Sequence, residues 1–399
     1  MNQKKFFISL CLFLVIFIVP SFRNVYHWFP FPELFAFLYL ISGGVVFYVL
    51  FRNVVITFIE KVPSKIIFLC GIVYLLIMSA FTFQVLDWSN SLKSFRRDST
   101  ADDAMILSAQ SFFDGAGMYN ATLYDGAPIS PGPGWILLNS PLSLSGLYFL
   151  ITPIWLGIFL WMIWKKSHHH FPVVFVLITL SMSTIFWTLT GVGHDLVSIS
   201  FAIGIFFLMT KNITKETRIL TLLFIAIFVG IISTSRILFL ILPCIFALII
   251  PFTKRAFLFF VTSLITALLF HFIFFELSSN YDPLHLFSRG ERSVGYDLMA
   301  LGGILEIGIG ALSLYLYTHP KIQFAYKNIL PLLLLFLPLF LISFGELRNV
   351  GFDFAKWEGA NYLIPVWGMY LVTILGEMNV AKTGSPVSRN RSLFMSLMK

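Results

Sequence analysis

Charged residues, cysteines and polar stretches are all scarce in this sequence. Charged residues make up 12% of its 399 residues and hydrophobic residues 58%, and the mean hydropathy is +0.88. No segment has the composition of a soluble domain, a long linker or a short repeat, and no glycine-rich loop that could cradle a phosphate is present. The three cysteines, Cys11, Cys70 and Cys244, lie in apolar segments. The sequence therefore predicts neither a disulfide framework nor a thiolate metal site.

Apolar windows recur from one end of the chain to the other, each of about 20 residues, the length that an α-helix needs to cross a bilayer. We therefore expect an all-α polytopic membrane protein of about 12 transmembrane helices, since twelve segments are apolar enough to lie in a bilayer. A single transmembrane domain covers residues 1–378, and a basic tail covers residues 379–399. The predicted segments are 6–22, 31–51, 66–86, 135–164, 172–190, 196–210, 219–233, 237–251, 256–276, 297–318, 328–345 and 361–378.

Two parts of this map allow a second interpretation. The run 219–251 fits one long helix or a tight hairpin, and we favour the hairpin because Ser233-Thr234-Ser235-Arg236 interrupts it midway. The first run follows Lys4 and Lys5 as a secretion signal would. However, Pro20-Ser21-Phe22-Arg23 is a poor cleavage site, so a retained anchor is expected.

The charged residues divide between the two sides that the predicted spans define. The loops on the N-terminal side hold 18 of the 27 Lys and Arg, whereas 16 of the 19 Asp and Glu fall on the opposite face. The positive-inside rule then predicts that both termini are cytoplasmic, and a bacterial inner membrane is the natural location. The net charge of +8 follows from this topology and from attraction to anionic membrane lipids, so no nucleic-acid partner is needed.

The outer side has three segments long enough to build a site. In the largest, Thr100 to Phe113 has the pattern of a helix lying in the interface, which Ser99 or Thr100 caps and Asp114-Gly115 ends. Carboxylates and a few arginines gathered on one face indicate ligand binding or chemistry there. The three segments are 87–134, 277–296 and 346–360.

Three motifs follow one another on this predicted outer side. Asp102-Asp103 opens the interfacial helix, a Gly and Tyr119 follow it, and Pro131-Gly-Pro133 begins the next span. Next comes Thr190-Gly191-Val-Gly193-His194-Asp195, and then Ser235-Arg236 with an apolar run to Pro243. In their order along the chain and in their predicted position on the outer side of the membrane, these motifs resemble those of GT-C glycosyltransferases, most of all the polyprenyl-phosphate-mannose type. The resemblance covers about residues 95–250, with one more span before the acidic loop than is usual and His194 where Gln is commoner.

The resemblance implies a GT-C-like fold and a definite reaction. Such enzymes move one sugar from a polyprenyl-phosphate lipid to a hydroxyl of a glycan, lipid or protein acceptor at the outer face. By analogy, Asp102 or Asp103 is the general base. The alternative is purely structural, because two acids in the first helical turn each favour the helix by about 0.3–1 kcal/mol. The resemblance implies no required cofactor. Binding of a divalent cation near Asp102 and Asp103 stays an open alternative, although two adjacent acids are a weak metal signal.

The departing lipid phosphate needs a cation or a helix N-terminus to stabilise its growing charge. Arg236, at the outer end of two apolar runs, is the first candidate, and pairing with Asp195 is the alternative. His194 and Asp195 are candidates for sugar or phosphate contact, or simply form a polar helix start. Arg348 and Arg289 are further phosphate candidates. Glu306, about three turns into its span, is a candidate intramembrane polar site.

Two other classes of membrane protein remain open as alternatives. A lipid or sugar transporter (flippase) suits twelve spans with cytoplasmic ends, but the sequence lacks two similar halves with broken helices in matching places. A polysaccharide polymerase or ligase is also polytopic with outer arginines, but its large outer loop usually comes late in the chain. Here the largest outer loop comes early, which favours the glycosyltransferase interpretation.

Overall fold

The computed structural model describes residues 3–93, 99–167, 170–278, 280–282, 294–318 and 329–382, and within them it contains helices and no β-strand. Proline occupies the first turn of α3, α7, α9 and α18, where its missing N–H leaves no helical hydrogen bond unmade. The α-helices are α1 (Gln3–Phe13), α2 (Phe22–Trp28), α3 (Pro32–Leu50), α4 (Asn53–Lys61), α5 (Ser64–Lys93), α6 (Ala101–Phe113), α7 (Pro133–Leu144), α8 (Ile151–Lys166), α9 (Phe171–Met182), α10 (Thr184–Gly191), α11 (Asp195–Thr210), α12 (Ile219–Ser233), α13 (Leu242–Ala247), α14 (Thr253–Leu277), α16 (Tyr296–Thr318), α18 (Leu330–Asn349) and α19 (Trp367–Lys382). The π-helix η1 (Leu14–Ile18) and the 3₁₀ helices η2 (Val19–Ser21), η3 (Tyr148–Leu150), η4 (Ile237–Ile241), η5 (Phe354–Lys356) and η6 (Glu358–Val366) connect them.

The predicted class of all-α polytopic membrane protein is confirmed. Among the described residues, 8 helices are long and apolar enough to cross a membrane, or up to 9 if the bent pair α9–α10 forms one span. The other three predicted segments, 196–210, 219–233 and 237–251, coincide with the shorter apolar helices α11, α12 and η4–α13. The count of twelve crossings stays a prediction.

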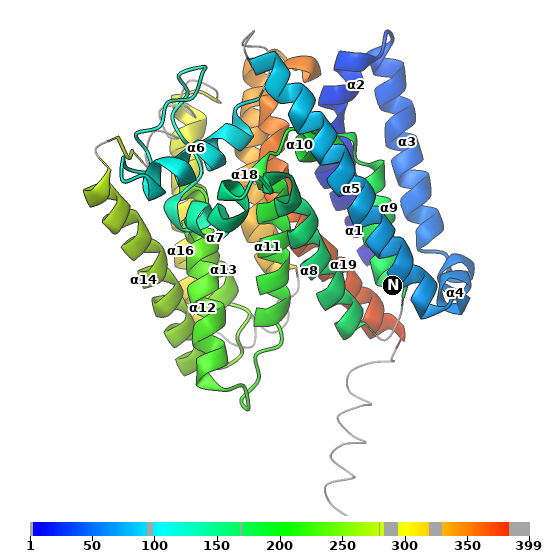
Figure 1. The fold of residues 1–399 in the computed structure, drawn as a ribbon. Helices are drawn as coiled ribbons and strands as arrows, with labels where there is room; N and C mark the ends of the chain where they lie inside the picture. The colour runs from blue at the N-terminus through cyan, green and yellow to red at the C-terminus, as the bar shows by residue number, and fades with distance from the viewer. Residues whose placement is uncertain are drawn as a thin grey trace, which may run out of the picture.

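The helices are arranged so that the predicted inner and outer segments lie at opposite ends of the molecule. The start of α1, helix α4 and the end of α19 lie at one end, and α2 and α6 lie at the other (Figure 1). Tyr370 and Trp367 of α19 donate side-chain hydrogen bonds to the carbonyl oxygens of Ser9 and Ile16, which shows that α19 returns antiparallel to the first span. The orientation of these ends relative to the cytoplasm stays a prediction.

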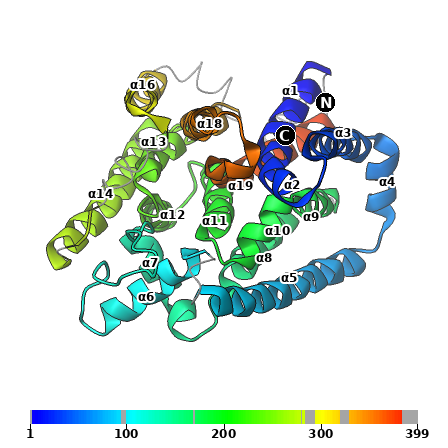
Figure 2. The same ribbon diagram turned by 90° about the horizontal axis from the view of Figure 1, so that it is seen from above.

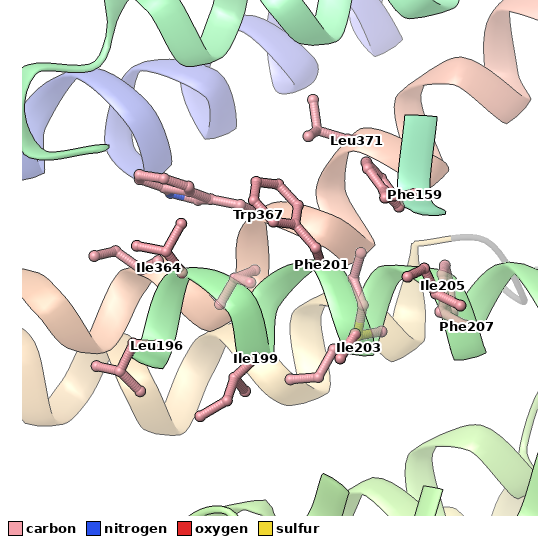
Figure 3. Packing of buried hydrophobic residues seen from close by; sticks show 14 of the residues in the cluster. Phe159, Leu196, Ile199, Phe201, Ile203, Ile205, Phe207, Ile364, Trp367 and Leu371 are labelled. Atoms are coloured by element: carbon pink, nitrogen blue, oxygen red, sulfur yellow. The ribbon is translucent and has the colours of Figure 1, made fainter. Parts of the chain in front are cut away.

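Helix α11 forms the centre of the bundle, between α8, α12 and α19 (Figure 2). Its side chains meet Phe159 of α8 and Trp367 of α19, and the Phe159 and Phe201 rings lie 5.7 Å apart (Figure 3). The backbones of α11 and α19 cross closely at Gly204 and Gly368, where a Cβ on Gly368 would lie 2.1 Å from the Ser200 carbonyl oxygen. Small residues at such crossings allow the close packing that holds membrane helices together.

Helices α3, α5 and α14 lie at the rim of the bundle (Figure 2). Their outward faces are apolar: Phe37 is 59% exposed, Leu76 63% and Phe272 64%. Exposed apolar surface on this scale suits contact with lipid and is rare on soluble monomers. These exposed apolar faces therefore agree with the membrane protein that the sequence predicts.

Two predicted spans are broken in the structure. Residues 135–164 were expected as one span, but α7 ends at Leu144 and Gly146 turns the chain with a φ of +74°. Residues 172–190 bend by 79° between α9 and α10. At that break Ser183 has an extended backbone, and its hydroxyl accepts from the amide of Phe186. The second break leaves α10 in the wall of the cavity described below.

Candidate functional site

A cavity of about 720 Å³ opens at the end of the molecule that carries α2 and α6. Its walls come from α2, the start of α6, the loop before α7, α10, the start of α11, the 236–239 turn, α18 and η6. It is also the place where the chain interrupts its helices, because the α10–α11 and α12–η4 junctions both lie in its wall. Of the candidates from the sequence, His194, Asp195 and Arg236 line it together.

Asp195 and Arg236 form a bidentate ion pair in the cavity wall. Arg236 donates from its two terminal nitrogens to the two carboxylate oxygens of Asp195, over 3.0 and 2.7 Å. A third N–H donates to the Ser235 carbonyl oxygen. The side chains are only 12% and 2% exposed. A guanidinium has five N–H donors, so donors remain for a ligand beside those that its described partners use.

His194 caps the start of α11 next to this pair. Its Nδ1 accepts from the amide of Leu196 at 3.3 Å and lies 3.4 Å from a carboxylate oxygen of Asp195. A nitrogen that accepts from an amide carries no proton, so in this hydrogen-bonding arrangement the neutral ring has its hydrogen on Nε2. The side chain is 20% exposed and lines the cavity, which leaves Nε2–H as a donor for a ligand.

The proline-rich segment before α7 holds the Arg236 turn in place. The amide of Gly132 donates to the Ser235 carbonyl oxygen at 3.1 Å. A Cβ on Gly132 would lie only 1.6 Å from the Thr234 carbonyl oxygen, so no other residue fits there. On its other side, the Tyr119 hydroxyl donates to the Pro131 carbonyl oxygen at 2.9 Å. Residues of the first sequence motif thus fix the position of the third.

Tyr119 is buried in an aromatic cluster against Tyr281, whose hydroxyl is hydrogen-bonded to Nδ1 of His271. Burial raises the pKa of Tyr119 well above its usual value, and neighbouring Tyr281 adds to the effect while Arg236 opposes it. The phenol therefore stays protonated and remains a donor to the Pro131 carbonyl oxygen.

The two aspartates proposed as the base open α6, as expected from the sequence. The helix starts at Ala101, with its amide donating to the Ser99 hydroxyl, and is capped at its end by Asp114. Asp102 is 2% exposed and faces Gly193, where an added Cβ would lie 3.2 Å from its own Cβ. Asp103 is half-buried. Neither side chain lines the cavity, although Ala101 and Ala104 of the same helix do.

Tyr148 connects the aspartates with the Asp195–Arg236 pair. Its hydroxyl donates to the Gly193 carbonyl oxygen at 2.6 Å. The charges of Asp195, Asp102 and Arg236 all lie close enough to this phenol for electrostatic coupling. The structure therefore gathers the three sequence motifs around one tyrosine.

A second polar wall of the cavity was missed by the sequence analysis as a site. It contains Arg23 of α2, Glu346 of α18 and Glu358 of η6. The Glu346 carboxylate lies against the backbone amides that begin η6 and couples electrostatically with Glu358 and Arg23. The signals in the sequence were the acids of the outer segment 346–360, which includes Glu346 and Glu358, and Arg23, a cation on the side from which the positive-inside rule depletes cations.

Helix α2 is held against the break between α9 and α10. Asn24 donates to the hydroxyls of Thr184 and Thr188 at 3.3 and 2.9 Å. The Ser21 hydroxyl accepts from the amide of Ile185 at 3.3 Å. These contacts orient α2 so that Arg23 and His27, one helical turn apart, both face the cavity.

The remaining candidates lie elsewhere. Arg348 is exposed near the end of α18 and outside the cavity lining, and Glu306 lies on α16, also outside the lining. Arg289 is outside the described residues. In the part of the chain that is described, no group of three or more His, Cys, Asp or Glu side chains is placed to hold a metal ion.

No family model, curated protein or solved structure matches this chain. The chemistry of the cavity therefore carries the functional argument.

Proposed function

We propose that this protein is a membrane glycosyltransferase that moves a sugar from a polyprenyl-phosphate donor to a hydroxyl acceptor at the extracytoplasmic face. The observation that supports it is a cavity of about 720 Å³ in a helical membrane protein. The cavity is lined by the buried ion pair of Asp195 and Arg236, by a histidine and by several further carboxylates. Its volume falls within the ~300–1,000 Å³ of typical ligand sites. A sugar–phosphate headgroup fits such a space while the polyprenyl tail lies along the apolar helices.

The leaving phosphate is proposed to bind at the start of α11. There, the unused N–H donors of Arg236, Nε2–H of His194 and the N-terminal end of the helix face the same cavity. All three favour negative charge, which grows on the phosphate oxygen as its bond to the sugar breaks. Asp195 neutralises Arg236 in the resting protein and holds it in one orientation, so the site binds phosphate chiefly by directed hydrogen bonds.

The general base is proposed to be Asp102 or Asp103, at the start of α6. As the acceptor oxygen attacks the anomeric carbon, its proton passes to the carboxylate, and the sugar–phosphate bond breaks with its electron pair going to the phosphate. Asp102 lies against Gly193, next to His194 in the chain, so the proposed base is close to the proposed phosphate site. Ala101 and Ala104 of the same helix turn line the cavity, so the start of α6 borders it.

Release of lipid phosphate by purified protein tests this proposal, with a panel of polyprenyl-phosphate sugars as donors. We expect Asp102→Asn or Asp103→Asn to abolish release while expression stays normal. Asp114→Asn is the matched control, because Asp114 is an exposed acid at the other end of the same helix. Full activity in both α6 variants would show that the base lies elsewhere, and Asp125, Glu346 and Glu358 of the cavity lining would be tested next.

The same assay separates transfer from transport. A donor that crosses the membrane with its sugar still attached to the phosphate, and without any new glycosidic bond, would favour a flippase. We further propose a bacterial inner membrane as the location, with both termini in the cytoplasm, from the distribution of Lys and Arg along the chain.

A further inference from the structure

Polar side chains gather at two places in the wall of the cavity, and the charged residues at each place interact with one another electrostatically. The first, on α11 and after α12, contains His194, Asp195 and Arg236. The second, which we name the α2–η6 wall, contains Arg23, Trp28, Glu346, Glu358, Asn361 and Tyr362. A transfer reaction has two substrates, and the first group accounts only for the phosphate of the donor.

The α2–η6 wall offers donors and acceptors side by side. No described carboxylate lies within the 4.0 Å ion-pair distance of Arg23, so its guanidinium faces the cavity with donors available. Glu358 is an exposed acceptor. Asn361 has its Oδ1 buried with no hydrogen-bond partner among the described residues. Asn361 also lines the cavity, so it adds a polar amide to the wall.

The wall also has aromatic surface. Trp28 is 57% exposed at its edge, and Tyr362 lines the same cavity. Aromatic rings supply apolar contact with a polar handle, which suits a ligand that has hydroxyls on its edges and C–H groups on its faces. One arginine and two glutamates give the wall a formal charge of −1, which disfavours a phosphate.

We propose that the α2–η6 wall is the acceptor subsite and that it binds an uncharged saccharide. The inference rests on the proposed glycosyl transfer and narrows its acceptor from a glycan, lipid or protein to a glycan. Sugar hydroxyls both donate and accept, so Arg23 donates to them while Glu358 accepts from them.

Saccharide binding without any lipid donor tests this inference directly. Full-length protein in detergent is examined by saturation-transfer NMR with the methyl glycosides of mannose, glucose, galactose and N-acetylglucosamine. We expect at least one glycoside to bind, and Arg23→Gln or Glu358→Gln to weaken it about 10-fold or more, since each removes a charge-assisted hydrogen bond. Lys356→Gln and Asp353→Asn are controls, because both residues are near Glu358 in the chain and outside the lining. The inference would be overturned if no glycoside bound, or if the two wall variants bound the glycosides as tightly as the wild type does.

Turnover then distinguishes failure of the subsite from failure of the proposed function. We expect the wall variants to raise KM for the saccharide and leave KM for the lipid donor unchanged. If transfer occurs and the wall variants leave the saccharide KM unchanged, the subsite is wrong and the glycosyltransferase stands. If glycosides bind through Arg23 and Glu358 but no donor in the panel releases lipid phosphate, the saccharide subsite stands and the transfer proposal fails. Binding of undecaprenyl phosphate that Arg23→Gln abolishes would instead make this wall the phosphate site and overturn the inference.

Discussion

The ion pair between Asp195 and Arg236 gives the sharpest test of the structure. Arg236→Gln leaves an ionised carboxylate that is 2% exposed without its bidentate partner, and Asp195→Asn leaves a guanidinium that is 12% exposed without its counter-ion. Breaking a buried pair from one side costs about 3–5 kcal/mol, because the remaining charge stays desolvated. At about 2 °C per kcal/mol for a chain of this size, each single variant should lower the Tm by about 6–10 °C.

The double variant Asp195→Asn/Arg236→Gln should be less damaging than the sum of the two single changes. No unpaired charge remains in the buried site, although the shorter glutamine does not reach the amide at position 195 as the arginine reaches Asp195. We expect a coupling free energy of about 2 kcal/mol or more between the two positions. The fraction of protein that stays monodisperse after heating, followed by size-exclusion chromatography in detergent, gives the apparent Tm of all four proteins. Single variants within ~2 °C of the wild type, or strict additivity in the double variant, would refute the buried bidentate pair.

Three further predictions follow from the same region. Gly132→Ala should lower the Tm by about 6 °C or more, because its Cβ would meet a backbone oxygen at 1.6 Å, whereas Gly71→Ala, with open space around its Cα, should not lower it. Tyr119→Phe should lose about 1 kcal/mol of stability with the hydrogen bond to Pro131. Burial raises the pKa of the Tyr119 phenol above its usual value of 10.0, so the stability from its hydrogen bond is fully present below pH 10.0 and is lost only as the pH rises towards the folded-state pKa. The difference in Tm between the wild type and Tyr119→Phe should therefore be constant from about pH 6 to 9. In a cysteine-free background, a membrane-impermeant maleimide should label Asp114→Cys from outside the cell and leave Lys215→Cys unlabelled, and the reverse would overturn the topology.

The positions of the helices could be predicted because apolar length is a property of local sequence. Each of the twelve predicted segments coincides with one or more helices, and α6 starts and ends within a residue of the predicted 100–113. The interruption predicted at Ser233-Thr234-Ser235-Arg236 is also present, since α12 ends at Ser233 and η4 begins at Ile237. The breaks at Gly146 and Ser183 were not predicted, because hydropathy averaged over about 20 residues hides a turn of three.

The candidate site was predictable only in part, for a physical reason. Pairing between Asp195 and Arg236 was one of the alternatives that the sequence left open, since both lie at outer helix ends, and the structure shows that pair. That Arg23 and Glu346 line one cavity was not predictable, because more than 300 residues of chain separate α2 from α18. A pattern along the sequence contains no information about which helix ends share a cavity.

The breaks in the helices and the position of the cavity have a common physical cause. Helix α11 has 16 residues and α12 has 15, so at about 1.5 Å per residue each is shorter than the ~30 Å hydrocarbon core. Backbone groups at such recessed helix ends have no water to bond with in lipid and must be satisfied within the protein. Here Gly132 meets the carbonyl oxygen of Ser235, Ser21 meets the amide of Ile185, and Tyr148 meets the carbonyl oxygen of Gly193.

The same recessed ends expose polar donors and acceptors to an enclosed space instead of to lipid, which is what a charged headgroup requires when its tail stays in the bilayer. Filling that space should therefore abolish ligand binding with little loss of stability. Thr188 lines the cavity on α10, and Thr188→Trp would place an indole inside it. Thr188→Val is the control, because it removes the same hydroxyl that accepts from Asn24 but adds almost no volume. We expect both variants to lose a similar ~1 kcal/mol from that hydrogen bond, and only the tryptophan to abolish release of lipid phosphate. Turnover that survives in the tryptophan variant would show that the substrate does not use this cavity.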